Sequence, residues 1–159
     1  MDATTLKGPF RATLEASLAE LERLSEILKA ERKALLGPDV SALEQVVLEK
    51  NRCLETLEHS VKAREQMLAQ LGLPGGLGGA EQFLSAHFSR DELLVQWKRL
   101  VELSREVAEL NVHNGKLAMA SERRAREALS ILTGRPLIPE TYSAKRGLTN
   151  STGITLGRC

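Results

Sequence analysis

Three histidines and two cysteines are the side chains that could bind a metal ion or act as nucleophiles. His59, His87 and His113 fall in different predicted helices and lack the short spacing of metal ligands. Neither Cys53 nor Cys159 belongs to a Cys-x-x-Cys motif, so we interpret both as reduced thiols. No motif pairs a nucleophile with a base. The sequence therefore predicts a protein that is not an enzyme and needs no metal or cofactor.

Two motifs could bind phosphate groups, and neither has the required pattern. In GLPGGLGG, residues 72–79, Glu81 follows where a phosphate loop has its third glycine, and no strand precedes the segment. We expect a flexible connection there. The run SERRAREA, residues 121–128, interleaves three arginines with two glutamates. This pattern favours a solvated helix with a Glu122–Arg126 ion pair over a nucleic-acid-binding helix.

A third group of residues is polar or small where a helix would place large apolar side chains. Asn111, Asn114 and Gly115 lie in the middle of a long predicted helix. The asparagines could fix the register of packed helices at a cost in stability. Glycine inside a helix costs roughly 0.8–1 kcal/mol relative to alanine, and it lets another chain approach closely. These residues leave both register control and contact with a partner open.

The elements that carry these residues are predicted to be helices. Leucines recur at helical spacing between residues 9 and 36, and Gly37-Pro38-Asp39 forms a turn. A second helix over residues 40–71 completes an antiparallel hairpin. The second helix is expected to bury one row of residues: Leu43, Val47, Lys50, Leu54, Leu57, Val61, Arg64, Leu68 and Leu71.

A short helix over residues 80–87 and a long helix over residues 90–133 complete the prediction. Trp97 is expected to anchor the core, and after residue 110 the inward side chains become smaller and more polar. We therefore expect the distal half of the long helix to be less buried against its own chain. The expected fold is all-α: an elongated antiparallel hairpin plus one long C-terminal helix, resembling a three-helix bundle or coiled coil. Residues 1–134 form this bundle, and residues 135–159 form an irregular tail that is flexible or folds on a partner.

Composition and charge exclude several other classes of function. The formal net charge is +1, so no strong overall field attracts nucleic acid or an anionic membrane. No apolar run approaches the roughly 18 residues needed to span a bilayer. The first residues do not resemble a secretory signal. We expect a cytoplasmic protein without membrane insertion.

Two segments resemble the FlgN family of flagellar export chaperones. They are EKNRCLETLE at residues 49–58, in the hairpin, and LNVHNGKL at residues 110–117, in the long helix. The resemblance implies a cytoplasmic protein that binds the C-terminal helical segments of hook–filament junction proteins. It also implies that the protein prevents their polymerisation and passes them to the flagellar export apparatus. By position, it implies roles for Asn111, Asn114, Gly115 and Tyr142, although the residues after Tyr142 depart from the family pattern.

We expect a client helix to contact a stripe that lies beside the asparagines. Its residues are Leu103, Leu110, Leu117 and Ile131. Tail residues Leu137, Ile138 and Tyr142 would close over the client. The alternative is a self-assembling structural coiled-coil protein, because asparagine within a packed row also suits a homodimer.

Overall fold

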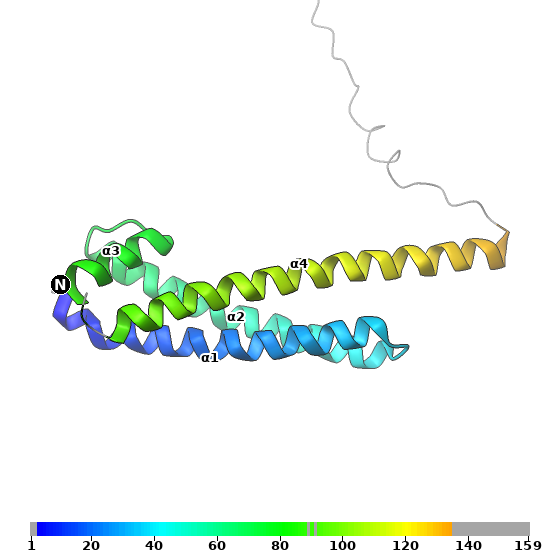
Figure 1. The fold of residues 1–159 in the computed structure, drawn as a ribbon, viewed down its shortest axis with the longest axis horizontal. Coiled ribbons are helices and arrows are strands. Elements are labelled where there is room, and N and C mark those ends of the chain that lie inside the picture. Colours follow the sequence, from blue (N-terminus) through cyan, green and yellow to red (C-terminus); the bar gives the residue numbers. More distant parts are fainter. Residues whose placement is uncertain (1–2, 89, 91, 135–159) are drawn as a thin grey trace, which may run out of the picture. The chain divides into compact units, whose positions relative to one another are not determined.

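The computed structural model describes residues 3–88, 90 and 92–134, and these residues form four helices (Figure 1). The helices are α1 (Ala3–Leu36), α2 (Val40–Gln70), α3 (Gly76–Phe88) and α4 (Glu92–Thr133). The described residues contain no strand, which confirms the all-α prediction. Within them, no helix is long and apolar enough to cross a membrane. The predicted tail contacts Leu137, Ile138 and Tyr142 lie outside the described residues.

Helix α1 begins at Ala3, so the prediction that it starts at Pro9 is wrong. Proline lacks the N–H that would bond the carbonyl of Thr5, which ordinarily disfavours this position. The side chains on either side explain the outcome, because Leu6 is 3% exposed and Phe10 is completely buried. Burying two large apolar residues outweighs one missing backbone hydrogen bond.

Helix α2 runs antiparallel to α1 after the turn at residues 37–39 (Figure 1). Asp39 caps its first turn, where the carboxylate accepts a 3.1 Å hydrogen bond from the amide of Ala42. Three members of the predicted buried row are instead exposed: Val47, Leu54 and Val61. The residues of α2 that are buried are Cys53, Arg64 and Leu68. The face that packs on α1 is therefore rotated from the predicted one.

The glycine-rich segment is shorter and more ordered than the predicted flexible connection. Gly72 follows α2 with a φ of 68°, a left-handed conformation that glycine adopts without strain. Helix α3 then begins at Gly76 and not at residue 80. A Cβ added to Gly79 would lie 1.7 Å from the carbonyl oxygen of Pro74. Gly79 therefore permits a close backbone approach at the start of α3.

An aromatic cluster joins three helices at one end of the first unit. The ring centroid of Phe10 in α1 lies 5.1 Å from that of Phe83 in α3 and 6.3 Å from that of Trp97 in α4. The guanidinium of Arg64 in α2 lies 5.1 Å from the centroid of the Trp97 ring. Trp97 is 2% exposed, which confirms the prediction that it anchors the core.

The chain divides into two compact units, Met1–Ser121 and Glu122–Cys159. In the first unit, α4 runs in the same direction as α1, since Trp97 contacts Phe10 and Asn114 contacts Leu28. Among the described helices, α1 and α2 make the most extensive close backbone approach, and the side chains of Trp97 and Asn114 join α4 to α1. In the second unit, the described residues are the end of α4 and Gly134. All their side chains are exposed except that of Ser130, which is half-buried.

Candidate functional site

A buried polar network joins the three long helices of the first unit toward the end that carries the turn between α1 and α2. The side-chain amide of Asn114 in α4 donates a 2.7 Å hydrogen bond to the carbonyl of Leu28 and a 2.8 Å bond to the Glu31 carboxylate. The ammonium of Lys50 in α2 donates to the other oxygen of Glu31 at 2.5 Å. Asn114 is 2% exposed and Glu31 is 5% exposed. Such charge-assisted bonds impose a fixed geometry on the three helices.

This network accounts for one of the two asparagines in the predicted site. The donors of Asn114 reach Leu28 and Glu31 at one position of α4 along α1, so the residue fixes the register of α4. Its Oδ1 atom is buried and has no hydrogen-bond partner among the described residues. Asn111 is exposed and lies outside the network. A structural role therefore explains Asn114 but not Asn111.

Gly115 has no close neighbour that would require glycine. A Cβ added to this residue would meet no atom within 4 Å, and the residue is exposed. The backbone is helical there, so the position does not need a left-handed conformation. Glycine therefore costs this helix roughly 0.8–1 kcal/mol relative to alanine, and no contact within the described part of the chain offsets that cost.

Gly115 belongs to an exposed stripe that we call the outer face of α4. The outer face consists of Ala108, Val112, Gly115 and Met119, spaced four, three and four residues apart. Val112 is 57% exposed and Met119 is 67% exposed. These residues form a solvent-facing strip of apolar and small side chains along this part of α4.

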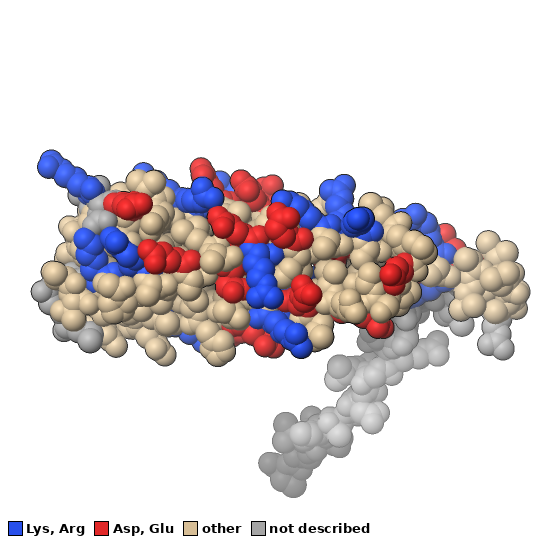
Figure 2. Space-filling model, turned by 90° about the horizontal axis from the view of Figure 1, so that it is seen from below, with Lys and Arg blue, Asp and Glu red and all other residues tan. Residues whose placement is uncertain are grey.

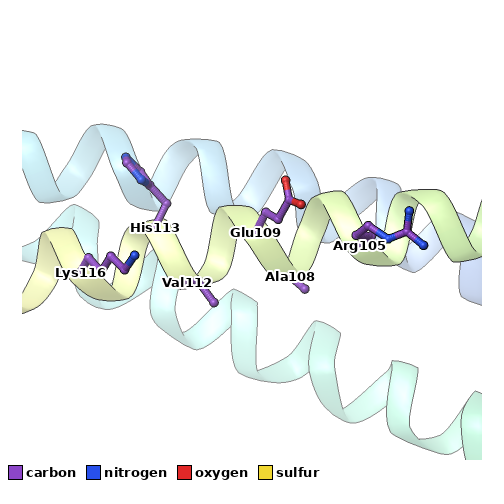
Figure 3. A pocket seen from close by; sticks show the side chains of 6 residues that line it. All are labelled: Arg105, Ala108, Glu109, Val112, His113 and Lys116. Atoms are coloured by element: carbon purple, nitrogen blue, oxygen red, sulfur yellow. The ribbon is translucent and has the colours of Figure 1, made fainter.

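An open depression of about 330 Å³ lies over this part of α4. Figure 3 shows that Ala108 and Val112 point to one side of the helix, and that Glu109 and His113 point to the other. The surface is therefore apolar along one edge and polar along the other. Its lining residues all come from α4: Arg105, Ala108, Glu109, Val112, His113 and Lys116.

The predicted client stripe is only partly accessible. Leu103 and Leu110 are half-buried and pack against the core of the first unit. Leu117 is also half-buried. In the second unit Ile131 is 82% exposed, and Leu129 and Leu132 are also largely exposed. The structure thus brings Leu103, Leu110 and Leu117 to one edge of α4 and leaves Ile131 in solvent.

Of the candidate reactive groups, the structure describes His59, His87, His113 and Cys53, whereas Cys159 lies outside the described residues. Over the described part of the chain, no group of three His, Cys, Asp or Glu side chains could hold a metal ion. The Cys53 thiol is buried, and its Sγ lies 3.2 Å from both the carbonyl oxygen and a carboxylate oxygen of Glu20. Burial and the Glu20 hydrogen bond raise the pKa of Cys53 to about 11. The thiol is therefore protonated and unreactive at neutral pH.

Charged side chains are mixed over the surface. Figure 2 shows acidic and basic side chains interleaved along the visible face of the first unit. In the second unit Arg126 donates to Glu122 at 2.5 Å, which confirms the predicted pair, and Arg123 lies 3.9 Å from Glu127. These arginines are engaged with neighbouring glutamates on their own helix, and this arrangement does not favour nucleic-acid binding.

Several residues of this region were not identified from the sequence. Val112 and Met119 lie at helical spacing from Gly115, and that spacing is a signal that could have identified the outer face. Lys50 belongs to the row that the sequence predicts to be buried, but its pairing with Glu31 has no local signal. Glu31 is one of many glutamates in the chain, and its partner Asn114 is distant in the sequence.

Comparisons of the sequence with known proteins match most of the chain. A family model described as FlgN protein matches residues 9–150, which include α1 to α4 almost completely. The flagella synthesis protein FlgN of Proteus mirabilis is 31% identical over 124 residues, which cover 77% of this chain and 78% of that protein. No solved structure matches the chain.

Proposed function

The chain belongs to the FlgN family, and we propose that it is a cytoplasmic flagellar export chaperone without enzymatic activity. It binds the C-terminal helical segments of hook–filament junction proteins. It keeps these segments from polymerising prematurely and passes the proteins to the flagellar export apparatus. The name of the Proteus relative, a flagella synthesis protein, supports the same general process.

The outer face of α4 is the observation that carries this proposal. Exposed apolar residues at helical spacing suit a partner helix, which buries its own apolar stripe against them. Gly115 lies between Val112 and Met119 and leaves open space where a larger side chain would stand. A client helix can therefore approach the α4 backbone closely at this point.

The residues predicted from the sequence take distinct parts in this binding mode. Asn111 and Gly115 are exposed and offer an amide and an open backbone position to the client. Asn114 supports the site indirectly by fixing the register of α4. The remaining proposed client contacts are Leu103, Leu110, Leu117 and Ile131, with Leu137, Ile138 and Tyr142 of the tail closing over the client.

The test is binding of a junction protein's C-terminal helical segment to the full-length protein. Met119→Asp places a charge on the outer face, and we expect it to weaken binding by at least about tenfold. Leu36→Asp is a matched control, because Leu36 is 69% exposed, Met119 is 67% exposed, and Leu36 lies in α1 outside the proposed client contacts. Equal affinity of Met119→Asp and the unmodified protein would remove the outer face from the proposed site.

Gly115→Leu gives a second, independent test of the same site. Leucine fills the open space and has a higher helix propensity than glycine. We therefore expect the unfolding midpoint to rise and the affinity for the client to fall. A destabilised protein would not produce this combination. Unchanged client affinity with a raised unfolding midpoint would show that the open space is not used by the client.

A further inference from the structure

Helix α2 carries an exposed apolar stripe of its own, in addition to the outer face of α4. Its residues recur every seven positions, and we call them the α2 row: Val40 (68% exposed), Val47 (36%), Leu54 (45%) and Val61 (36%). A repeat of seven residues keeps apolar side chains along one line of a helix and is the pattern that pairs helices in coiled coils. The repeat spans most of α2.

The helices that the structure describes leave the α2 row exposed. The residues of α2 that contact other helices lie on a neighbouring line of the helix surface. Cys53 contacts Glu20 of α1, Lys50 pairs with Glu31 of α1, and Arg64 lies over Trp97 of α4. The row therefore has the spacing of a packing surface, and no residue among 3–88, 90 and 92–134 buries it.

Charge along the row indicates what kind of helix it accepts. The exposed residues four positions after the row residues are Glu44, Asn51, Glu58 and Glu65, so this edge of the row is acidic. Lys62 lies 2.6 Å from Glu58 and offsets part of that charge. On the other edge, the positions three residues after the row residues are half-buried or buried: Leu43, Lys50, Leu57 and Arg64.

We propose that the α2 row is a docking surface for an amphipathic helix whose own seven-residue apolar repeat is flanked by lysine or arginine. Flanking charges select partners in paired helices, because opposite charges attract and like charges repel. A second copy of α2 would bring the same glutamates together across the contact. The acidic edge therefore favours a basic partner helix over self-pairing. This surface is separate from the proposed client site on α4.

Two synthetic peptides of roughly 28 residues, or four heptads, test the proposal. Both carry the same apolar repeat, and one has lysine at the flanking positions where the other has glutamate. Fluorescence anisotropy with the full-length protein measures their affinities. We expect the lysine peptide to bind at least about tenfold more tightly. The triple variant Glu44→Lys, Glu58→Lys and Glu65→Lys should reverse the order.

Two single variants separate this surface from the client site. Leu54→Asp should abolish binding of the lysine peptide and leave junction-protein binding intact, and Met119→Asp should do the opposite. Equal affinity for both peptides, or full binding by Leu54→Asp, would overturn the proposal. So would a dimer of the unliganded protein that Leu54→Asp dissociates in sedimentation experiments. A photocrosslinker in place of Leu54 that reacts with residues 135–159 of the same chain would also overturn it.

Discussion

The side-chain amide of Asn114 lies 2.8 Å from a carboxylate oxygen of Glu31, although the two residues are 83 positions apart in the sequence. Both are buried, and the other carboxylate oxygen bonds Lys50. Helix α4 is thus positioned on α1 by a directional polar contact in addition to apolar packing. Apolar contacts alone tolerate small shifts along a helix, whereas this hydrogen bond does not.

Replacing Asn114 should destabilise the protein more than replacing Asn111. Asn114→Ala removes two donors and leaves buried acceptors on Leu28 and Glu31 with one partner fewer. We expect a loss of about 1–3 kcal/mol in the free energy of unfolding. Asn111→Ala changes an exposed residue and should stay within about 0.5 kcal/mol of the unmodified protein. Urea denaturation measures both, and equal losses would refute the register role of Asn114.

Removing Lys50 should cost stability because the buried Glu31 loses its cation. The Lys50 side chain is 19% exposed, so we expect Lys50→Met to lose about 1–3 kcal/mol, below the range for a fully buried pair. Glu31→Gln in the Lys50→Met background removes the buried charge and keeps an acceptor for Asn114. The double variant should therefore be more stable than Lys50→Met alone. A double-mutant cycle that finds independent effects would contradict this coupling.

Replacing the neighbouring residues Gly78 and Gly79 by alanine should change the thermal midpoint in opposite directions. A Cβ at Gly79 would collide with the backbone of Pro74, whereas a Cβ at Gly78 would meet nothing within 4 Å. Both residues are in α3, where alanine is favoured over glycine by roughly 0.8–1 kcal/mol. We expect Gly78→Ala to raise the thermal midpoint and Gly79→Ala to lower it. A rise in both variants would mean that the contact between Pro74 and Gly79 relaxes without cost.

The Cys53 thiol should make the protein less stable in alkaline solution. Its pKa is raised from 9.0 to about 11 by burial and by the hydrogen bond to Glu20. The unfolded chain therefore loses the thiol proton at a lower pH than the folded chain does. This contribution to stability is complete below pH 9.0 and is lost as the pH rises through about 11.

Urea midpoints measured across that pH range would test this expectation. Cys159→Ser is used as the background, so that Cys53 is the remaining cysteine in every protein. Adding Cys53→Ala removes the thiol, so the urea midpoint should fall less between pH 9.0 and about 11 than it does in the background protein. Other groups that lose protons in this range are the same in both proteins. If the two proteins lose stability in parallel, the thiol does not contribute. Alkylation of Cys53 should also require unfolding, since the side chain is 1% exposed.

The helices of this fold could be predicted because their signals are local. Leucine spacing and the breaker at Gly37-Pro38-Asp39 indicate the first two helices directly. The start of α1 could not be predicted in this way, because Pro9 is tolerated only through the burial of Phe10 against residues of α3 and α4. Tertiary packing decided that boundary.

The buried face of α2 could not be predicted from the local sequence either, because it also depends on tertiary packing. Two adjacent lines along the helix, one through Val47 and Leu54 and one through Val46 and Cys53, differ little in apolarity. The choice depends on contacts from elsewhere, such as that of Cys53 with Glu20. The role of Asn114 also stayed open, because its partner Glu31 is one of many glutamates in the sequence.

The long separation of Glu31 from Asn114 has a consequence for a chain that is still being made on the ribosome. Lys50 is 19 residues from Glu31, so both leave the ribosome early and can pair while the hairpin forms. Asn114 is synthesised later, on the order of seconds at typical rates of translation. During that interval Leu28 and Glu31 lack the α4 contact that buries them in the complete protein. The nascent hairpin therefore exposes an apolar and acidic surface until α4 is synthesised.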